Sequence, residues 1–239
     1  MGDHSEVTQP PVETETPMPE TGRPVLSSER LKAFEDAVVA IAMTLLILPL
    51  LENVSESARE GKSSLEFVQE EHSQLFSFGL SFLIIAVFWM THHRVFDRVE
   101  KVTSPLVWLQ VGWMLTIVWL PVSTAMLGSM DTDTTQKVLY IGALLVSSLL
   151  MLATRLYLRR HPELHRIDPE SLRRGIVAEL VTSGLFAVAL AIAVLVPVIG
   201  YAAMFLLMLS GPVQALFSRR SPVGKGRGGK GNAAEDNAA

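Results

Sequence analysis

Long stretches without a charged residue constrain the fold of this chain most strongly. Hydrophobic residues make up 49% of its 239 residues, and they gather in blocks. About 20 apolar residues cross the hydrocarbon core of a bilayer as one helix, so each block can hold at least one span. Continuous apolar runs also differ from the short alternating segments of membrane barrels. The uncharged blocks are residues 73–91, 102–130, 138–154 and 180–218. We therefore expect an all-α integral membrane protein.

The number of spans follows from splitting the longest block. Residues 180–218 are too many for one span, and Pro197 and Gly200 bracket a natural tight turn within them. With the apolar segment near the N-terminus, the sequence predicts a bundle of six transmembrane helices. Their expected bounds are 29–51, 73–93, 104–127, 137–158, 173–196 and 199–217.

The two ends of the chain are expected to lie outside the bundle. Residues 1–27 are rich in Pro, Thr and Glu, and we expect a disordered tail there. Residues 218–239 carry a Gly- and Lys-rich run typical of a flexible basic tail that contacts anionic lipid. The membrane domain is thus predicted to span residues 28–217.

Basic residues predict the orientation of the chain. Loops rich in Lys and Arg stay in the cytoplasm. With both termini inside, only Arg59, Lys62 and Lys137 fall on the outer side. We expect a multi-pass protein of the plasma (cell inner) membrane with both termini cytoplasmic, which an even number of spans requires.

The sequence offers little for catalysis. It has no Cys, which excludes disulfides and catalytic thiols. It also lacks a Gly-rich phosphate loop, a nucleophile elbow and a His-Glu-x-x-His motif. We expect no enzyme, no catalytic residue, no bound metal or cofactor, and no nucleic-acid partner.

One stripe of the first helix is a candidate for contact with ions. Ile41, Thr44 and Leu48 follow helical spacings of three and four, and Ala37 and Leu51 extend the stripe. In an oligomer, apolar rings can close a pore by dewetting, and a Thr hydroxyl can replace part of an ion's water shell. Alternatively, the stripe packs on a neighbouring helix and Thr44 bonds back to the Ala40 carbonyl.

Charged residues at the start of the same helix form a second candidate group. Arg30 and Phe34 share a face, whereas Glu35 and Asp36 point to different sides and should find different partners. These residues either form a structural network at the cytoplasmic end of the helix, or both acids extend to the surface near the positive end of the helix dipole.

The end of the second helix is predicted to lie at the same depth. It carries Trp89, His92 and His93. Adjacent histidines point about 100° apart on a helix, which disfavours one shared metal. We expect one of them to donate a hydrogen bond to Asp36 or Glu35, which makes a pH-sensitive contact possible.

Three further segments have plain structural interpretations. Pro121 is expected to kink the third helix and to free a backbone carbonyl, which neighbouring Ser or Thr hydroxyls can satisfy. Glu179 follows Arg173 and Arg174 and is expected to form an interfacial ion pair. The alanine-rich run at 187–193 is typical of a close helix-packing face.

The pattern Arg30-x-x-x-Phe34-Glu35-Asp36, followed by an apolar helix, resembles the first helix of the transmembrane protein 175 family of endolysosomal and prokaryotic potassium channels. The family motif is Arg-x-x-x-Phe-Ser-Asp, and Glu35 stands at its Ser position. Further similarity lies in the segment from Phe88 to Arg94 and in the Leu-Pro-x-Ser-Thr element at 120–124. The resemblance covers roughly residues 28–217.

That resemblance implies a homotetramer of six-helix chains whose first helices surround a central pore. It assigns the hydrophobic constriction to Ile41, a second apolar ring to Leu48, and a Thr layer linked to potassium preference to Thr44. The implied function is a potassium-preferring cation leak channel without a carbonyl selectivity filter. Its implied partners are further copies of the chain, potassium ions and membrane lipids.

Two other classes of function stay open from the residues. A proton-coupled secondary transporter would use Asp36 and Glu35 with His92 or His93 as a relay, although broken helices typical of transporters are few here. A membrane enzyme or scaffold has only the His pair in its favour.

Overall fold

The structure, a computed structural model, describes residues 27–130 and 133–195. Within these ranges it is all-α, as predicted, with two isolated β-bridges and no strand. The elements in chain order are α1 Ser28–Leu45, α2 Leu48–Arg59, α3 Ser64–Glu70, α4 His72–Phe96, α5 Ser104–Ser129, α6 Thr134–Arg160, the 3-10 helix η1 Pro162–Leu164, and α7 Pro169–Leu195.

Five helical stretches of the described residues are long and apolar enough to cross a membrane. The first is Ser28–Arg59, which takes in α1 and α2, and the others are α4, α5, α6 and α7. Four of the predicted spans match α4 to α7 to within four residues at each end. The sixth predicted helix, 199–217, and both predicted tails lie outside the described residues, apart from Ser27. The chain is a multi-pass membrane protein.

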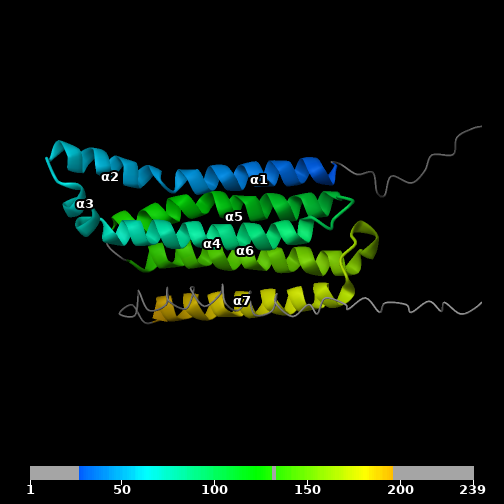
Figure 1. Ribbon diagram of the computed structural model, residues 1–239. Helices are drawn as coiled ribbons and strands as arrows, with labels where there is room; N and C mark the ends of the chain where they lie inside the picture. The colour runs from blue at the N-terminus through cyan, green and yellow to red at the C-terminus, as the bar shows by residue number, and fades with distance from the viewer. Residues whose placement is uncertain (1–26, 131–132, 196–239) are drawn as a thin grey trace, which may run out of the picture.

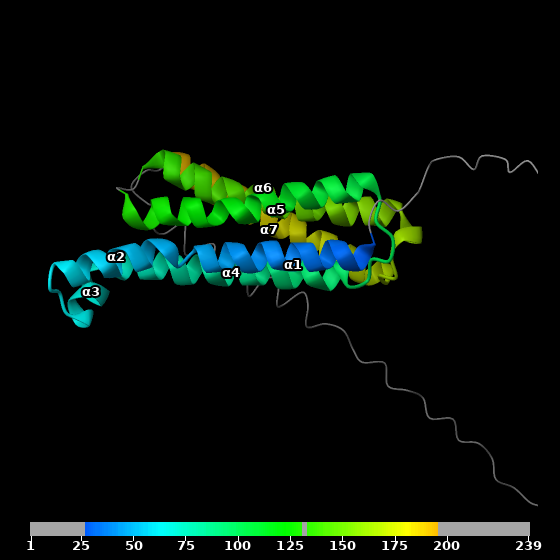
Figure 2. The same cartoon turned by 90° about the horizontal axis from the view of Figure 1, so that it is seen from above.

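The long helices lie side by side along one axis (Figure 1). The element α1 packs on α4 and α5, α5 packs on α6, and α6 packs on α7. Seen from above, α1 runs along α4 while α5 and α6 form a neighbouring layer (Figure 2). The core between them is almost fully buried and includes Ala42, Ile85, Ile117, Leu144 and Phe186. In the alanine-rich run, Ala189 and Ala193 are buried, which confirms part of that run as a packing face.

The predicted first span, 29–51, lies within the apolar stretch Ser28–Arg59, but its continuity as one helix is wrong, because the helix is interrupted between α1 and α2. The N–H of Ile47 donates to the Thr44 carbonyl, only three residues back, at 3.3 Å. Pro49 explains the break, since it has no N–H for the Leu45 carbonyl and its ring crowds that group. Pro49 instead occupies the first turn of α2, where the missing donor costs nothing.

Pro121 has a milder effect on α5, which continues through it. The Thr124 hydroxyl donates to the Leu120 carbonyl at 2.7 Å, and Ser123 donates to the same carbonyl at 3.1 Å. Both hydroxyls bond the carbonyl just before the proline, whereas the carbonyl that Pro121 leaves without its helical donor is that of Ile117, four residues back. These bonds therefore do not confirm the prediction that a hydroxyl satisfies the freed carbonyl.

Loops at one end of the bundle hold the start of α1. Ser27 caps the helix, and its side chain accepts from the N–H of Arg30 at 3.4 Å. The Ser28 hydroxyl donates to the Val99 carbonyl at 2.6 Å. Val99 and Leu164, from the two loops at this end, are buried in one small core. The first turn of α1 therefore has a fixed position against α4 and the α6–α7 connection.

Candidate functional site

The two faces of α1 differ sharply in burial. One stripe, at spacings of four, four and three residues, is buried against α4 and α5: Leu31, Glu35, Val39 and Ala42. The opposite face is covered by no helix of the described part of the chain. It exposes large apolar side chains and the small side chains of Ala33, Ala37 and Ala40.

The predicted stripe lies on this exposed face. Ile41 is 59% exposed and Leu48 is 48% exposed, and Thr44 is exposed between them. The Thr44 hydroxyl donates to the carbonyl of Ile41 at 2.8 Å. The alternative bond to Ala40 is therefore wrong by one residue, and packing of the stripe on a helix of the same chain is absent among the described residues.

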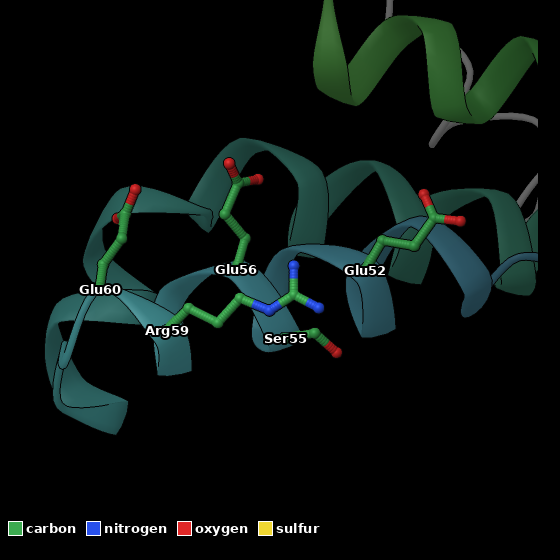
Figure 3. Close-up of a pocket in the computed structure, with 5 residues that line it drawn as sticks. All are labelled: Glu52, Ser55, Glu56, Arg59 and Glu60. Carbon is green, nitrogen blue, oxygen red and sulfur yellow. The ribbon is translucent and has the colours of Figure 1, made fainter.

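Beyond the break, α2 is strongly acidic. Glu52, Glu56 and Glu60 line an open pocket of about 590 Å³ together with Ser55 and Arg59. Figure 3 shows the three carboxylates in a row along the helix, with the Arg59 side chain extending back toward Ser55. This end of the α1–α2 segment attracts cations electrostatically, less so at high salt.

A lysine fastens the end of α2 to α3. Lys62 Nζ lies 2.7 Å from Glu60 and 2.6 Å from Glu70. Hydrogen bonds to these two carboxylates raise the pKa of Lys62 above its usual range. Its charge therefore persists at any physiological pH.

Asn53 ties the middle of α2 to the start of α4. Its amide nitrogen donates to Glu71 at 2.9 Å and to Gln74 at 2.8 Å, and Gln74 in turn donates to the Ser129 hydroxyl at 2.9 Å. The exposed row of glutamates is thus presented by a helix that is anchored at its middle and at its end.

At the opposite end of α1, Glu35 and Asp36 face different partners, as predicted. The indole nitrogen of Trp89 donates to Asp36 Oδ1 at 2.7 Å. His93 Nδ1 lies 3.8 Å from the same oxygen, beyond hydrogen-bonding distance. The predicted hydrogen bond from a histidine to Asp36 is therefore wrong, and Trp89 makes that bond instead.

Glu35 is buried, which excludes the alternative in which both acids extend to the surface. It is 2% exposed, and its Oε2 lies 3.7 Å from Nε2 of His92. Neither carboxyl oxygen of Glu35 has a hydrogen-bond partner among the described residues. A histidine bond to Glu35 is therefore also wrong.

His92 is held by residues that sequence analysis missed. Its Nε2 donates to Gln110 at 2.7 Å, and the Gln110 amide donates to the Thr154 hydroxyl at 3.1 Å. The imidazole stacks between Phe96 and Trp113, with ring centroids 4.4 Å and 4.1 Å away. The sequence signal for this series of hydrogen bonds is Gln110 itself, a polar amide within an otherwise apolar span.

Arg30 and Phe34 do not join this buried group. Arg30 is exposed and Phe34 is 59% exposed, on the outward side of α1. Of the seven residues predicted to form a network, five lie in two neighbouring groups, Asp36 with Trp89 and His93, and Glu35 beside His92. Arg30 and Phe34 border the exposed face.

Glu179 has a different partner from the one its sequence neighbours suggested. It is 4% exposed and its Oε1 lies 3.5 Å from Nε of Arg155 on α6. Arg173 pairs instead with Glu170, at 3.3 Å. The predicted ion pair exists, but it joins α6 to α7 inside the bundle.

Comparison with known proteins gives consistent matches. Residues 30–121 match the model of the family described as endosomal/lysosomal potassium channel TMEM175. The endosomal/lysosomal proton channel TMEM175 of Danio rerio is 28% identical over 57% of this chain and 26% of its own length. A potassium channel of Streptomyces collinus is 34% identical over 42% of this chain and 47% of its own length. Matches thus span half or less of these curated relatives.

Two solved structures share the fold. A crystal structure of a lysosomal potassium-selective channel TMEM175 homolog from Chamaesiphon Minutus has a TM-score of 0.62 at 20% identity, covering 79% of this chain and 97% of that one. The potassium channel MtTMEM175 has a TM-score of 0.55 at 16% identity, covering 85% of this chain and 98% of that one. At these identities the likeness concerns the helical arrangement.

Proposed function

We propose that the chain is a member of the TMEM175 channel family, whose model its residues 30–121 match, and that it is a potassium-preferring cation channel with its constriction in α1. The observation that carries the proposal is the exposed face of α1, on which Ile41, Thr44 and Leu48 lie in one stripe. The relatives named as channels support conduction rather than coupled transport or catalysis.

Further copies of the chain are the proposed cover for this face. Ala37 in the stripe, and Ala33 and Ala40 on the same exposed face, allow neighbouring helices to approach closely. Four copies would bring four α1 helices around one axis, as in the homotetramer that the family resemblance implies. Rings of Ile41 and Leu48 would then narrow the passage and close it by dewetting.

The geometry of Thr44 suits a cation at the same axis. Its hydroxyl hydrogen is donated to the Ile41 carbonyl at 2.8 Å, so the oxygen presents its lone pairs outward. A ring of such oxygens replaces part of the hydration shell of a potassium ion. The glutamates of α2 raise the local cation concentration at one end of the passage.

The transporter alternative has less support from the same residues. His92 is 3% exposed and enclosed by Phe96, Trp113 and Gln110. His93 and Asp36 lie beyond hydrogen-bonding distance of each other. We place the protein in the plasma membrane with both termini cytoplasmic, from the distribution of Lys and Arg.

Flux measurements on the purified full chain in liposomes test the proposal. We expect non-saturating potassium flux that exceeds sodium flux, together with a tetrameric mass. Ile41→Asn should raise the flux and weaken the preference for potassium. Leu83→Asn is the matched control, since Leu83 is a 53% exposed apolar residue of α4. A monomeric mass, or equal effects of the two substitutions, would reject the proposed pore.

A further inference from the structure

A second polar site lies on the other side of the bundle from the exposed face of α1. It is a small cavity between four helices, lined by Phe88 and Thr91 of α4, Trp113 of α5, Ser147, Ser148 and Met151 of α6, and Glu179 of α7. The space in which the centre of a water molecule can lie is about 10 Å³. One water molecule therefore fits, and nothing much larger does.

The lining contains polar atoms that need a partner. Ser147 is 1% exposed, and its hydroxyl makes no hydrogen bond with any described residue. The neighbouring Ser148 differs, because its hydroxyl bonds to Ser183 at 2.9 Å and to the Leu145 carbonyl at 2.9 Å. A buried hydroxyl without a partner is costly, and ordered water is the usual remedy.

The Arg155–Glu179 pair decides what the cavity can hold. Arg155 Nε and Glu179 Oε1 are 3.5 Å apart, and Nε forms no hydrogen bond within the described part of the chain. The guanidinium lies against Gly175, where a Cβ would come within 2.2 Å of its Nη1. The absence of a side chain at Gly175, one helical turn before Glu179, therefore makes room for the guanidinium beside the carboxylate. Because it already balances the charge of Glu179, the cavity favours a neutral ligand over a cation.

We propose that this cavity is a binding site for a single water molecule, which accepts a hydrogen bond from Ser147 and donates one to the Glu179 carboxylate. The water supplies the missing partner of Ser147 and solvates an ion pair that would otherwise be poorly hydrated in the membrane. It thereby joins α6 to α7 independently of the α1 stripe, so the inference does not rest on the proposed function.

A structure of the full protein at a resolution that shows ordered water is the direct test. We expect a density peak within 3.2 Å of both Ser147 Oγ and Glu179 in the parent protein. Absence of a peak would overturn the proposal. So would a peak that is replaced by rubidium or thallium in crystals soaked with those ions, since that would identify a cation site.

Thermal unfolding provides an independent test. Ser147→Ala removes the hydroxyl and with it one hydrogen bond of the proposed water. We expect the apparent Tm to fall by about 2–4 °C. In a dry cavity the same substitution removes a buried hydroxyl without a partner, which leaves Tm unchanged or raised. Ser55→Ala is the control for a serine-to-alanine change in a helix, because the Ser55 hydroxyl bonds the Leu51 carbonyl within α2. An unchanged or raised Tm for Ser147→Ala, relative to this control, contradicts the proposal.

Discussion

The indole nitrogen of Trp89 on α4 donates a 2.7 Å hydrogen bond to the carboxylate of Asp36 on α1. This contact sets how far α1 is displaced along α4, and with it the height of the exposed stripe. Just inside it, Glu35 lies beside His92, so consecutive residues of α1 face two consecutive turns of α4. Residues outside the stripe thus position it.

Replacing Trp89 by Phe keeps an aromatic ring and removes the donor. We expect the free energy of unfolding to fall by about 1 kcal/mol. A hydrogen bond to a carboxylate can be worth more, but the Asp36 side chain is 43% exposed, so water partly replaces the lost donor. Asp36→Asn should cost a similar amount, and the double variant should show that the two losses are coupled. Thermal unfolding measures this. Trp108→Phe, at a 73% exposed position of α5, should be nearly neutral.

Thr44→Ala tests the proposed role of the hydroxyl in potassium selectivity. We expect a shift of the reversal potential toward that of a non-selective pore under potassium–sodium gradients, with conduction retained. Thr116→Ala is the matched control, because Thr116 on α5 bonds the Trp113 carbonyl three residues back at 2.7 Å in the same way. An unaltered reversal potential in Thr44→Ala, or an equal shift in both variants, would remove Thr44 from this role.

Pro49→Ala should join α1 and α2 into one helix. The new N–H can donate to the Leu45 carbonyl, and a proline costs a helix interior roughly 3 kcal/mol. We expect amide hydrogen exchange over residues 46–50 to slow by about tenfold or more. Pro121→Ala should change exchange much less, since α5 is already continuous there. Unchanged exchange at 46–50 would mean that another feature causes the break.

Asn53→Ala should release α2 from α4. Both bonds of the Asn53 amide, to Glu71 and Gln74, are lost at once, with an expected cost of about 1–2 kcal/mol. Hydrogen exchange in α2 should accelerate while exchange in the middle of α4 stays the same. Ser55→Ala serves as the control, because the Ser55 hydroxyl bonds only within α2, to the Leu51 carbonyl. Equal hydrogen exchange in α2 of both variants would contradict the proposal that Asn53 holds α2 against α4.

The start of α7 should respond to acid. The backbone N–H of Ser171 donates to Asp168 at 2.9 Å, which lowers the pKa of Asp168 below its usual value of 3.8. A lowered pKa in the folded state means that the stabilisation is present above that value and is lost as the pH falls through the folded pKa. Asp168→Asn should therefore show a smaller loss of Tm than the parent between about pH 4 and pH 2. If the difference in Tm between the parent and Asp168→Asn stayed constant from about pH 4 to pH 2, protonation of Asp168 would not be linked to stability.

The spans α4 to α7 were predictable because charge-free length is a local property of the chain. The same holds for Glu35 and Asp36, whose separation around the helix follows from 3.6 residues per turn. The interruption at Pro49 was predictable in principle, since a proline inside an apolar helix carries its own signal. The continuous hydrophobicity of 31–51 masks that signal.

Partners across helices were not predictable in this way. Which residue faces His92 depends on how α4 and α5 are displaced and rotated relative to each other, and Gln110 meets it only in the folded bundle. Similarly, Glu179 pairs with Arg155 on another helix rather than with Arg173, which is satisfied locally by Glu170. Local charge patterns in sequence do not contain that information.

The interruption between α1 and α2 also determines how force travels through the molecule. A continuous helix would transmit a displacement of its far end directly to Ile41, but the break between α1 and α2, where the Ile47 N–H reaches back only to Thr44 and Pro49 has no N–H, acts as a hinge. The shortest mechanical route from α2 to the bundle runs sideways, through Asn53 into α4. Displacement of α2 therefore reaches Ile41 indirectly, by way of α4, whose Trp89 donates to Asp36 of α1.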